Sequence, residues 1–198
     1  MHTWGIDTGG LYYPELLEKT SLRTFDEVST FIGEHICSHP ICVETGTAYG
    51  FPIDDPYWNT TSSLVKRICE PLDGKLISID IEDRSKNIDA LFAAGDPERS
   101  RVSLLQGDSR LVMKDIDFGK IDLLCLDSGE DPDLLLDEYL AVQDQLAEQH
   151  YVLVDDIHNT HSVKYEKIVP LLIHMSYNWM QVPTETGLFV SSLGYPIP

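Results

Sequence analysis

The chemistry that this sequence suggests begins at a glycine-containing turn. The run VETGTAYG (43–50) contains Glu44, Gly46, Thr47 and Gly50, and glycines in such a turn let a ligand approach the backbone closely. The dinucleotide-binding fingerprint G-x-G-x-x-G is absent. An acid at Glu44 would repel a pyrophosphate but suits a cationic or hydroxyl-bearing ligand. The alternative is an ordinary turn between a strand and a helix.

Two more acids follow the next β-like runs. Asp80 is followed by Ile81, and a carboxylate at this point is placed to accept both hydroxyls of a ribose. Asp108 precedes Ser109 and could accept from an adenine amino group. The alternatives are a solvated strand end for Asp80 and a helix N-cap for Asp108. The sequence alone leaves both alternatives open.

Three aspartates follow the last two β-like runs of the main pattern. Asp127 ends one run, and Asp155 and Asp156 end the next. Adjacent parallel strands would bring these carboxylates together, where they repel one another. A hard divalent cation with oxygen ligands, most simply Mg²⁺, is one compensation, and solvated or helix-capping acids are the alternative. We therefore expect a metal site at Asp127, Asp155 and Asp156, with Asp155 the better placed of the pair.

The elements that must position these residues alternate along the chain. The β-like runs are continuous and apolar, as in strands buried on both faces of a parallel sheet. With helical patterns between them, right-handed crossovers give an open, doubly wound α/β sheet. Two further β-like runs in the tail predict a C-terminal antiparallel hairpin, so the sheet is mixed and mostly parallel. The predicted strands are 41–45, 75–81, 101–107, 120–127 and 150–156, and the predicted helices are 24–38, 62–72, 85–95, 131–149 and 163–175.

Length and composition set limits on the class of protein. The chain has 198 residues and a formal net charge of −19, which disfavours nucleic acid and membrane surfaces as partners. Its 42% of hydrophobic residues excludes a disordered chain. We expect one domain over 1–198, with a helical segment at 1–39 and the sheet core at 40–198. Since we find neither a membrane-spanning run nor a signal-peptide pattern, we expect a soluble, cytoplasmic protein.

Together, these acids and glycines resemble class I S-adenosylmethionine-dependent methyltransferases over about residues 40–195. The resemblance implies a Rossmann-like fold and S-adenosylmethionine as the cofactor. It also implies that Glu44 lies near the methionine amino group, Asp80 on the ribose hydroxyls and Ile81 beside the adenine. The cofactor-binding residues that it implies are Glu44, Gly46, Thr47, Gly50, Asp80, Ile81, Asp108, Ser109 and Asp127.

Within that superfamily, the chain is similar to small catechol-type and macrolide-sugar O-methyltransferases. In those enzymes Mg²⁺ is bound by an acid after the fourth strand and by a pair after the fifth, which Asp127 and Asp155–Asp156 match. The similarity implies that the metal chelates two oxygens of the substrate and lowers the pKa of a hydroxyl, whose oxygen then attacks the methyl group. We therefore expect O-methylation of a small hydroxylated acceptor, with Asp127 catalytic and Mg²⁺ as a second cofactor.

The chain also departs from that pattern. The stretch after Asp127 has no lysine to serve as a base, and a related group of methyltransferases often has His where this chain has Glu130. His158, in the segment after Asp156, is then the candidate catalytic base, above all if no metal is bound. Two other readings stay open: a catalytically inactive binding module with this fold, and another Rossmann-like nucleotide-binding enzyme. The sequence also leaves open a homo-oligomer.

Overall fold

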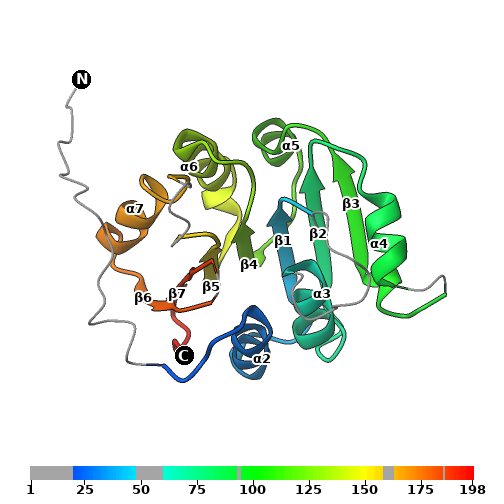
Figure 1. The fold of residues 1–198 in the computed structure, drawn as a ribbon, viewed down its shortest axis with the longest axis horizontal. Helices are drawn as coiled ribbons and strands as arrows, with labels where there is room; N and C mark the ends of the chain where they lie inside the picture. The colour runs from blue at the N-terminus through cyan, green and yellow to red at the C-terminus, as the bar shows by residue number, and fades with distance from the viewer. Residues whose placement is uncertain (1–19, 48–59, 93–94, 158–162, 185) are drawn as a thin grey trace.

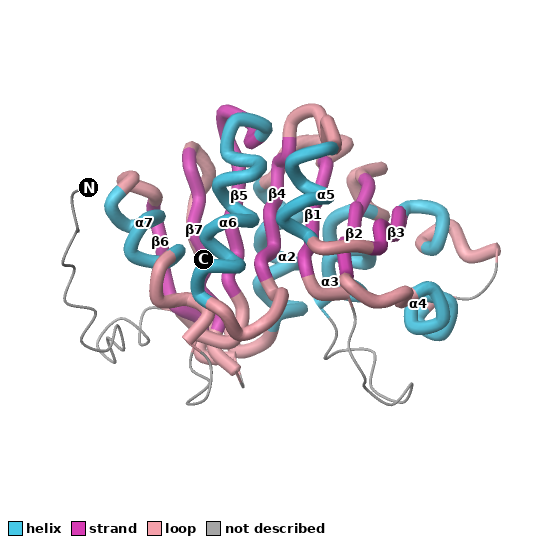
Figure 2. Tube along the Cα trace, turned by 90° about the horizontal axis from the view of Figure 1, so that it is seen from above, coloured by secondary structure: helices cyan, strands magenta, loops and turns pink. Residues whose placement is uncertain are grey.

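The sheet is mixed and mostly parallel. A computed structural model describes residues 20–47, 60–92, 95–157, 163–184 and 186–198, and within these ranges seven strands form one sheet in the order β3-β2-β1-β4-β5-β7-β6 (Figures 1 and 2). The first five strands in this order pair in parallel, and β7 pairs antiparallel with both β5 and β6. The predicted doubly wound sheet with a C-terminal antiparallel hairpin is therefore confirmed. The strands are β1 (Ile41–Thr45), β2 (Lys75–Asp80), β3 (Val102–Gln106), β4 (Ile121–Leu126), β5 (Leu146–Val154), β6 (Asn178–Val182) and β7 (Leu188–Leu193).

Neighbouring residues of the strands face two different hydrophobic cores. Cys42 and Leu123 lie in the core that includes residues of α2, α3 and α4, whereas Val43 and Leu124 lie in the core that includes residues of α5, α6 and α7. Burial on both faces explains why the strands read as continuous apolar runs. The helices are α2 (Phe25–His35), α3 (Thr60–Leu64), α4 (Ser85–Leu91), α5 (Ser109–Asp115), α6 (Pro132–Val142) and α7 (Ile168–His174).

Several helix starts follow from local side-chain chemistry. Thr24 caps α2 by accepting from the backbone N–H of Glu27, whose carboxylate accepts in return from the backbone N–H of Thr24. Asp131 caps α6 ahead of Pro132, which needs no backbone N–H at this position. Of the helices in the part of the chain described, none is long and apolar enough to cross a membrane.

The predicted helix over 131–149 is wrong in its C-terminal part. α6 ends at Val142, a short 3₁₀ turn follows at Gln143–Gln145, and β5 begins at Leu146. Leu146 pairs with Ile121 of β4, so strand pairing overrides the helical propensity of this stretch. The predicted helix over 62–72 is also modified, because α3 passes into a π-helical turn at Val65–Cys69.

Candidate active site

Glu44 is a buried carboxylate at the carboxyl end of β1. It is 0% exposed and accepts hydrogen bonds from the hydroxyls of Thr60 (2.9 Å), Thr61 (2.8 and 3.0 Å) and Ser78 (2.7 Å). Burial raises the pKa of Glu44 to about 7, and the three hydroxyls oppose that rise. These contacts hold the start of α3 against β1 and β2. The contact of Glu44 with a cofactor amino group stays a prediction.

The backbone requires a glycine at position 46, where the turn after β1 contacts the backbone that follows β4. Its φ is +84°, and a Cβ atom at this position would lie 2.3 Å from the backbone oxygen of Asp127. Its N–H also donates to the carbonyl of Ile79, at 2.9 Å. The glycine therefore serves the packing of the chain itself, in addition to any ligand that approaches the turn. Gly50, the other predicted glycine, lies outside the described residues.

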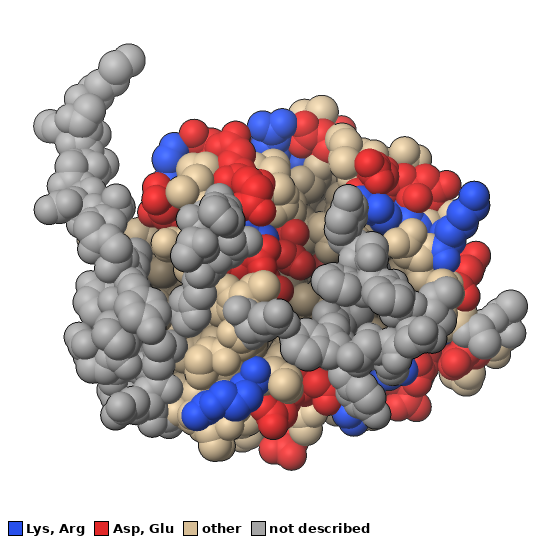
Figure 3. All heavy atoms as spheres, viewed as in Figure 1, with Lys and Arg blue, Asp and Glu red and all other residues tan. Residues whose placement is uncertain are grey.

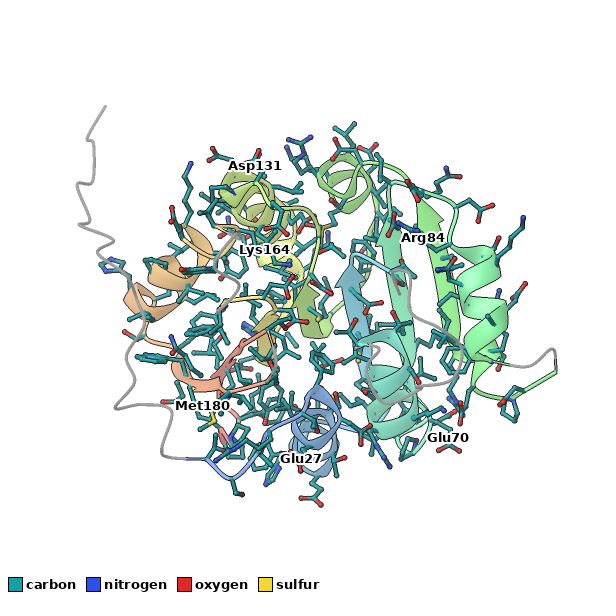
Figure 4. All side chains as sticks on the ribbon, in the orientation of Figure 1. Glu27, Glu70, Arg84, Asp131, Lys164 and Met180 are labelled. Carbon is teal, nitrogen blue, oxygen red and sulfur yellow. The ribbon has the colours of Figure 1, made fainter. Side chains whose placement is uncertain are left out.

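Asp80 lies at the end of β2 and is held by three donors. Its Oδ1 accepts from the backbone N–H of Glu82 (2.8 Å), and its Oδ2 accepts from the backbone N–H of Thr47 (3.1 Å) and from Nε of Arg84 (3.2 Å; Figure 4). The next residue, Ile81, is 67% exposed, the most exposed of the large hydrophobic side chains described. A carboxylate and an apolar surface therefore stand side by side at this strand end.

A cavity of about 480 Å³ lies along β3 and reaches the carboxyl end of β2 at Asp80. Its wall is mixed, with hydroxyls, charged groups and leucine side chains, which suits a ligand that is partly polar and partly apolar. Residues in this wall include Thr47, Asp80, Arg84, Ser85, Leu104 and Gln106.

Asp108 and Ser109 both have partners within the chain. Asp108 caps α5 and pairs with Arg110, which lowers the pKa of the Asp108 carboxyl. The Ser109 hydroxyl donates to Glu138, which also accepts from the hydroxyl of Thr45 at 3.0 Å. Glu138 is 0% exposed, and burial raises its pKa although these hydroxyls oppose the rise. The N-cap alternative for Asp108 is thus present in the structure, and its contact with an adenine stays a prediction.

Glu138 is a buried carboxyl, in contact with the predicted site residue Ser109, that the sequence analysis missed. The spacing along the sequence could have indicated its burial. Leu135, Tyr139 and Val142 are all buried on α6, and helical periodicity places Glu138 on the same face. A glutamate inside an apolar stripe needs polar partners, and Thr45 and Ser109 provide them.

The ends of β4 and β5 meet as the parallel pairing predicts. Leu126 pairs with Val154, so Asp127 and Asp155 follow at neighbouring positions. Between the acids lies the ammonium group of Lys164, whose Nζ donates to Oδ1 of Asp127 and to Oδ2 of Asp156, each at 2.9 Å (Figure 4). Burial disfavours the charged ammonium, but the two carboxylates outweigh it and raise the pKa of Lys164. The sequence analysis missed this lysine.

The donor set does not fit a divalent metal as it stands. One oxygen each of Asp127 and Asp156 faces an ammonium, and Oδ1 of Asp155 accepts from the backbone N–H of Asp156 (2.9 Å) and the hydroxyl of Thr186 (3.2 Å). Among the described residues, no group of three or more His, Cys, Asp or Glu side chains is arranged to hold a metal ion. The candidate base, His158, lies outside the described residues.

The match to known families decides the class of the protein. A family model described as a methyltransferase domain matches residues 43–157, more than half of the chain. The chain belongs to this methyltransferase family. The matched stretch runs from β1 to just beyond β5, so it contains Glu44, Asp80 and Asp127. The predicted class I S-adenosylmethionine-dependent methyltransferase is therefore confirmed. No curated protein matches the chain significantly.

Solved structures with the same fold include several methyltransferases. An rRNA methylase from Streptococcus thermophilus has a TM-score of 0.59 at 13% identity, over 88% of this chain and 98% of its own. The O-methyltransferase TomG from Streptomyces achromogenes, in complex with SAM, has a TM-score of 0.61 at 16% identity, over 85% and 78%. The MycE methyltransferase of the mycinamycin pathway, in complex with Mg and SAH, has a TM-score of 0.53 at 15% identity, over 85% and 48%. At these identities the likeness concerns the fold.

Proposed function

We propose that this methyltransferase transfers the methyl group of S-adenosylmethionine to an oxygen of a small hydroxylated acceptor. The observation that carries the proposal is the arrangement at the ends of β1 and β2. There the Gly46 turn and the exposed Ile81 side chain adjoin the Asp80 carboxylate, and Thr47 and Asp80 line a cavity of about 480 Å³. The O-methyltransferases among the structural neighbours support the choice of oxygen as the atom methylated.

The residues at this edge fit the cofactor. A carboxylate offers about four acceptor sites, and donors among the described residues use three of those of Asp80, which leaves a fourth for a ribose hydroxyl. The second ribose hydroxyl would replace the hydrogen bond that Arg84 donates to Asp80. Ile81 offers an apolar surface to an adenine, and its 67% exposure is then covered by the ligand. When bound, S-adenosylmethionine supplies a methyl group on a positively charged sulfur.

The surface charge favours a small acceptor over a nucleic acid. Acidic side chains are spread over the face shown in Figure 3, including its upper part, where a few basic ones lie among them and toward which the arrows of β2 and β3 point in Figure 1. With a net charge of −19, the protein repels phosphate backbones. We therefore take the similarity to the rRNA methylase as a similarity of fold and not of substrate.

The acceptor hydroxyl must lose its proton as the new O–C bond forms and the S–C bond breaks. His158 follows the acidic end of β5 by two residues, and we propose it as the base that takes this proton. In this proposal Asp127 lies on the side of the site that binds the acceptor. A hydrogen bond from Lys164 holds its carboxylate in place. Methyl transfer needs little covalent chemistry from the protein, so positioning of the acceptor and exclusion of water dominate.

The test is release of S-adenosylhomocysteine from S-adenosylmethionine with a panel of catechols, phenols and hydroxylated sugars, and with an rRNA fragment as a separate arm. We expect turnover with a hydroxylated small molecule and none with RNA. His158→Ala should lower kcat at least tenfold with little change in cofactor affinity, while His174→Ala, the matched histidine control, should not. Tight cofactor binding without turnover on any acceptor would instead favour an inactive binding module, and turnover on RNA would refute the small acceptor.

A further inference from the structure

Lys164 is nearly inaccessible and lies between carboxylates from two strand ends. Its side chain is 2% exposed, and its Nζ lies 2.9 Å from an oxygen of Asp127 and 2.9 Å from an oxygen of Asp156. Nζ also lies 3.4 Å from the backbone oxygen of Ser128. The three oxygens around the buried ammonium form an environment that stabilises a cation.

The charges explain why a cation is needed there. The pairing of β4 with β5 forces Asp127, Asp155 and Asp156 together, and uncompensated carboxylates at this separation repel one another. Lys164 supplies one positive charge and hydrogen bonds to two of the three. Mg²⁺ would need the same oxygens at about 2.0–2.1 Å, and two cations cannot share them. Binding of a metal would therefore require Lys164 to leave a buried position.

We propose that the Lys164 ammonium takes the place of a divalent cation at the ends of β4 and β5, so that these strand ends bind no metal in the native enzyme. Lys164 is then a positioning residue that orders Asp127 and Asp156 on the acceptor side of the proposed site. The proposal concerns the site of the proposed function, but its readout is metal binding. It can therefore fail while methyl transfer to a small acceptor stands, and the reverse also holds.

The experiment compares thermal melting in excess EDTA with melting in saturating Mg²⁺ or Mn²⁺. The wild-type protein should melt at the same temperature in all three. Lys164→Ala should melt at a lower temperature in EDTA and rise by several degrees when Mn²⁺ or Mg²⁺ is added, because the freed carboxylates become metal ligands. A purely structural role for Lys164 predicts the fall without the rise.

Two variants serve as controls. Lys167→Ala removes a lysine that pairs with Asp133 and is 45% exposed, and it should show no response to metal. Lys164→Arg keeps the positive charge and should also show none. Should Lys164→Ala fail to fold in any condition, calorimetric titration of Mn²⁺ into the wild type and Lys164→Arg decides the matter. Stoichiometric Mn²⁺ binding by the wild type, or a folded Lys164→Ala protein that ignores metal, overturns the proposal.

Discussion

The two halves of the carboxyl edge of the sheet stabilise their acids in different ways. In the half formed by β1, β2 and β3, Glu44 is surrounded by three neutral hydroxyls, and Asp80 accepts from two backbone N–H groups as well as from Arg84. In the half formed by β4 and β5, Asp127 and Asp156 share the buried ammonium of Lys164. Both halves place acids at strand ends, but in the second one buried ammonium bridges two of them, whereas in the first Arg84 pairs with Asp80 and hydroxyls hold Glu44.

The difference shows that a strand-end acid does not by itself reveal what compensates it. Hydroxyl donors add no charge, so a buried carboxyl such as Glu44 can still take up a proton near neutral pH. An ammonium between two carboxylates favours their charged forms and competes with any other cation. In the first half the charge of Glu44 therefore depends on pH near neutrality, whereas in the second half Lys164 partly neutralises the acids before a ligand arrives.

The largest effect is expected at the junction of the two halves. Gly46→Ala should lower the free energy of unfolding by more than about 4 kcal/mol, because its Cβ would lie 2.3 Å from the backbone oxygen of Asp127. Gly95→Ala is the matched control: its φ is +88° with nothing within 4 Å, so it should cost only about 1–2 kcal/mol. Denaturant unfolding measures both. Equal losses would mean that β4 yields to a side chain at residue 46.

Glu44 should make stability depend on pH in the first half. Its pKa is raised by burial from 4.5 to about 7, so the folded state favours the protonated form, and the wild type should lose roughly 3 kcal/mol of stability from this group as pH rises from about 4.5 to about 7. Glu44→Gln removes the titration, so its stability relative to the wild type should increase over that window. Unfolding curves at pH 5 and pH 8 measure the change, with Glu34→Gln, an exposed glutamate on α2, as the control. A constant difference between Glu44→Gln and the wild type would contradict the assignment.

Asp80 should affect the cofactor more than the fold. A charge-assisted hydrogen bond is worth about 1.5–3 kcal/mol, so Asp80→Ala should weaken S-adenosylhomocysteine binding roughly ten- to a hundredfold in calorimetry. Glu70→Ala, at an exposed glutamate outside the wall of the cavity, should change the affinity little. If Asp80→Ala binds as the wild type does, the ribose contact is wrong.

Substitutions of Asp108 should have the smallest effect. They distinguish its role as a helix N-cap from a contact with adenine. As the N-cap of α5, Asp108→Ala should cost about 1 kcal/mol of stability, and Asp108→Asn should cost almost nothing because Asn caps as well. An adenine contact adds a second expectation, namely that cofactor affinity falls in both variants, since Asn offers only one carbonyl acceptor and carries no charge. Melting and calorimetry on the two proteins distinguish a cap from a ligand.

Much of the fold could be predicted from the sequence because both faces of the central strands are buried. The strand over 41–45 was predicted with its observed bounds, and Thr24 was identified as the start of α2. The end of α6 could not be predicted, since Leu146 is drawn into β5 by Ile121, a residue 25 positions earlier in the chain. Pairing at that distance leaves no trace in local periodicity.

The residues of the candidate site likewise fall into those that local sequence could indicate and one that depends on distant contacts. The positions of Asp80, Asp127 and Asp155 at one edge of the sheet could be predicted because the carboxyl ends of parallel strands gather there, while their roles stay predictions. Lys164 could not, because it lies 37 residues from Asp127 in a turn before α7, and only the folded chain places its ammonium between two strand ends. The resemblance to metal-binding enzymes led to the expectation of an external cation, and the structure places the ammonium of Lys164 among the same carboxylates.

The position of β7 has a consequence for synthesis on the ribosome. β6 leaves the ribosome before β7, yet among the described strands it pairs only with β7, which lies between β6 and β5. Until Leu188–Leu193 has emerged, β5 exposes an unpaired edge and β6 has no place in the sheet. A nascent chain that stalls before residue 188 therefore presents a template on which a second chain can add a strand. Among the described strands, β7 is thus the one that covers the edge of β5.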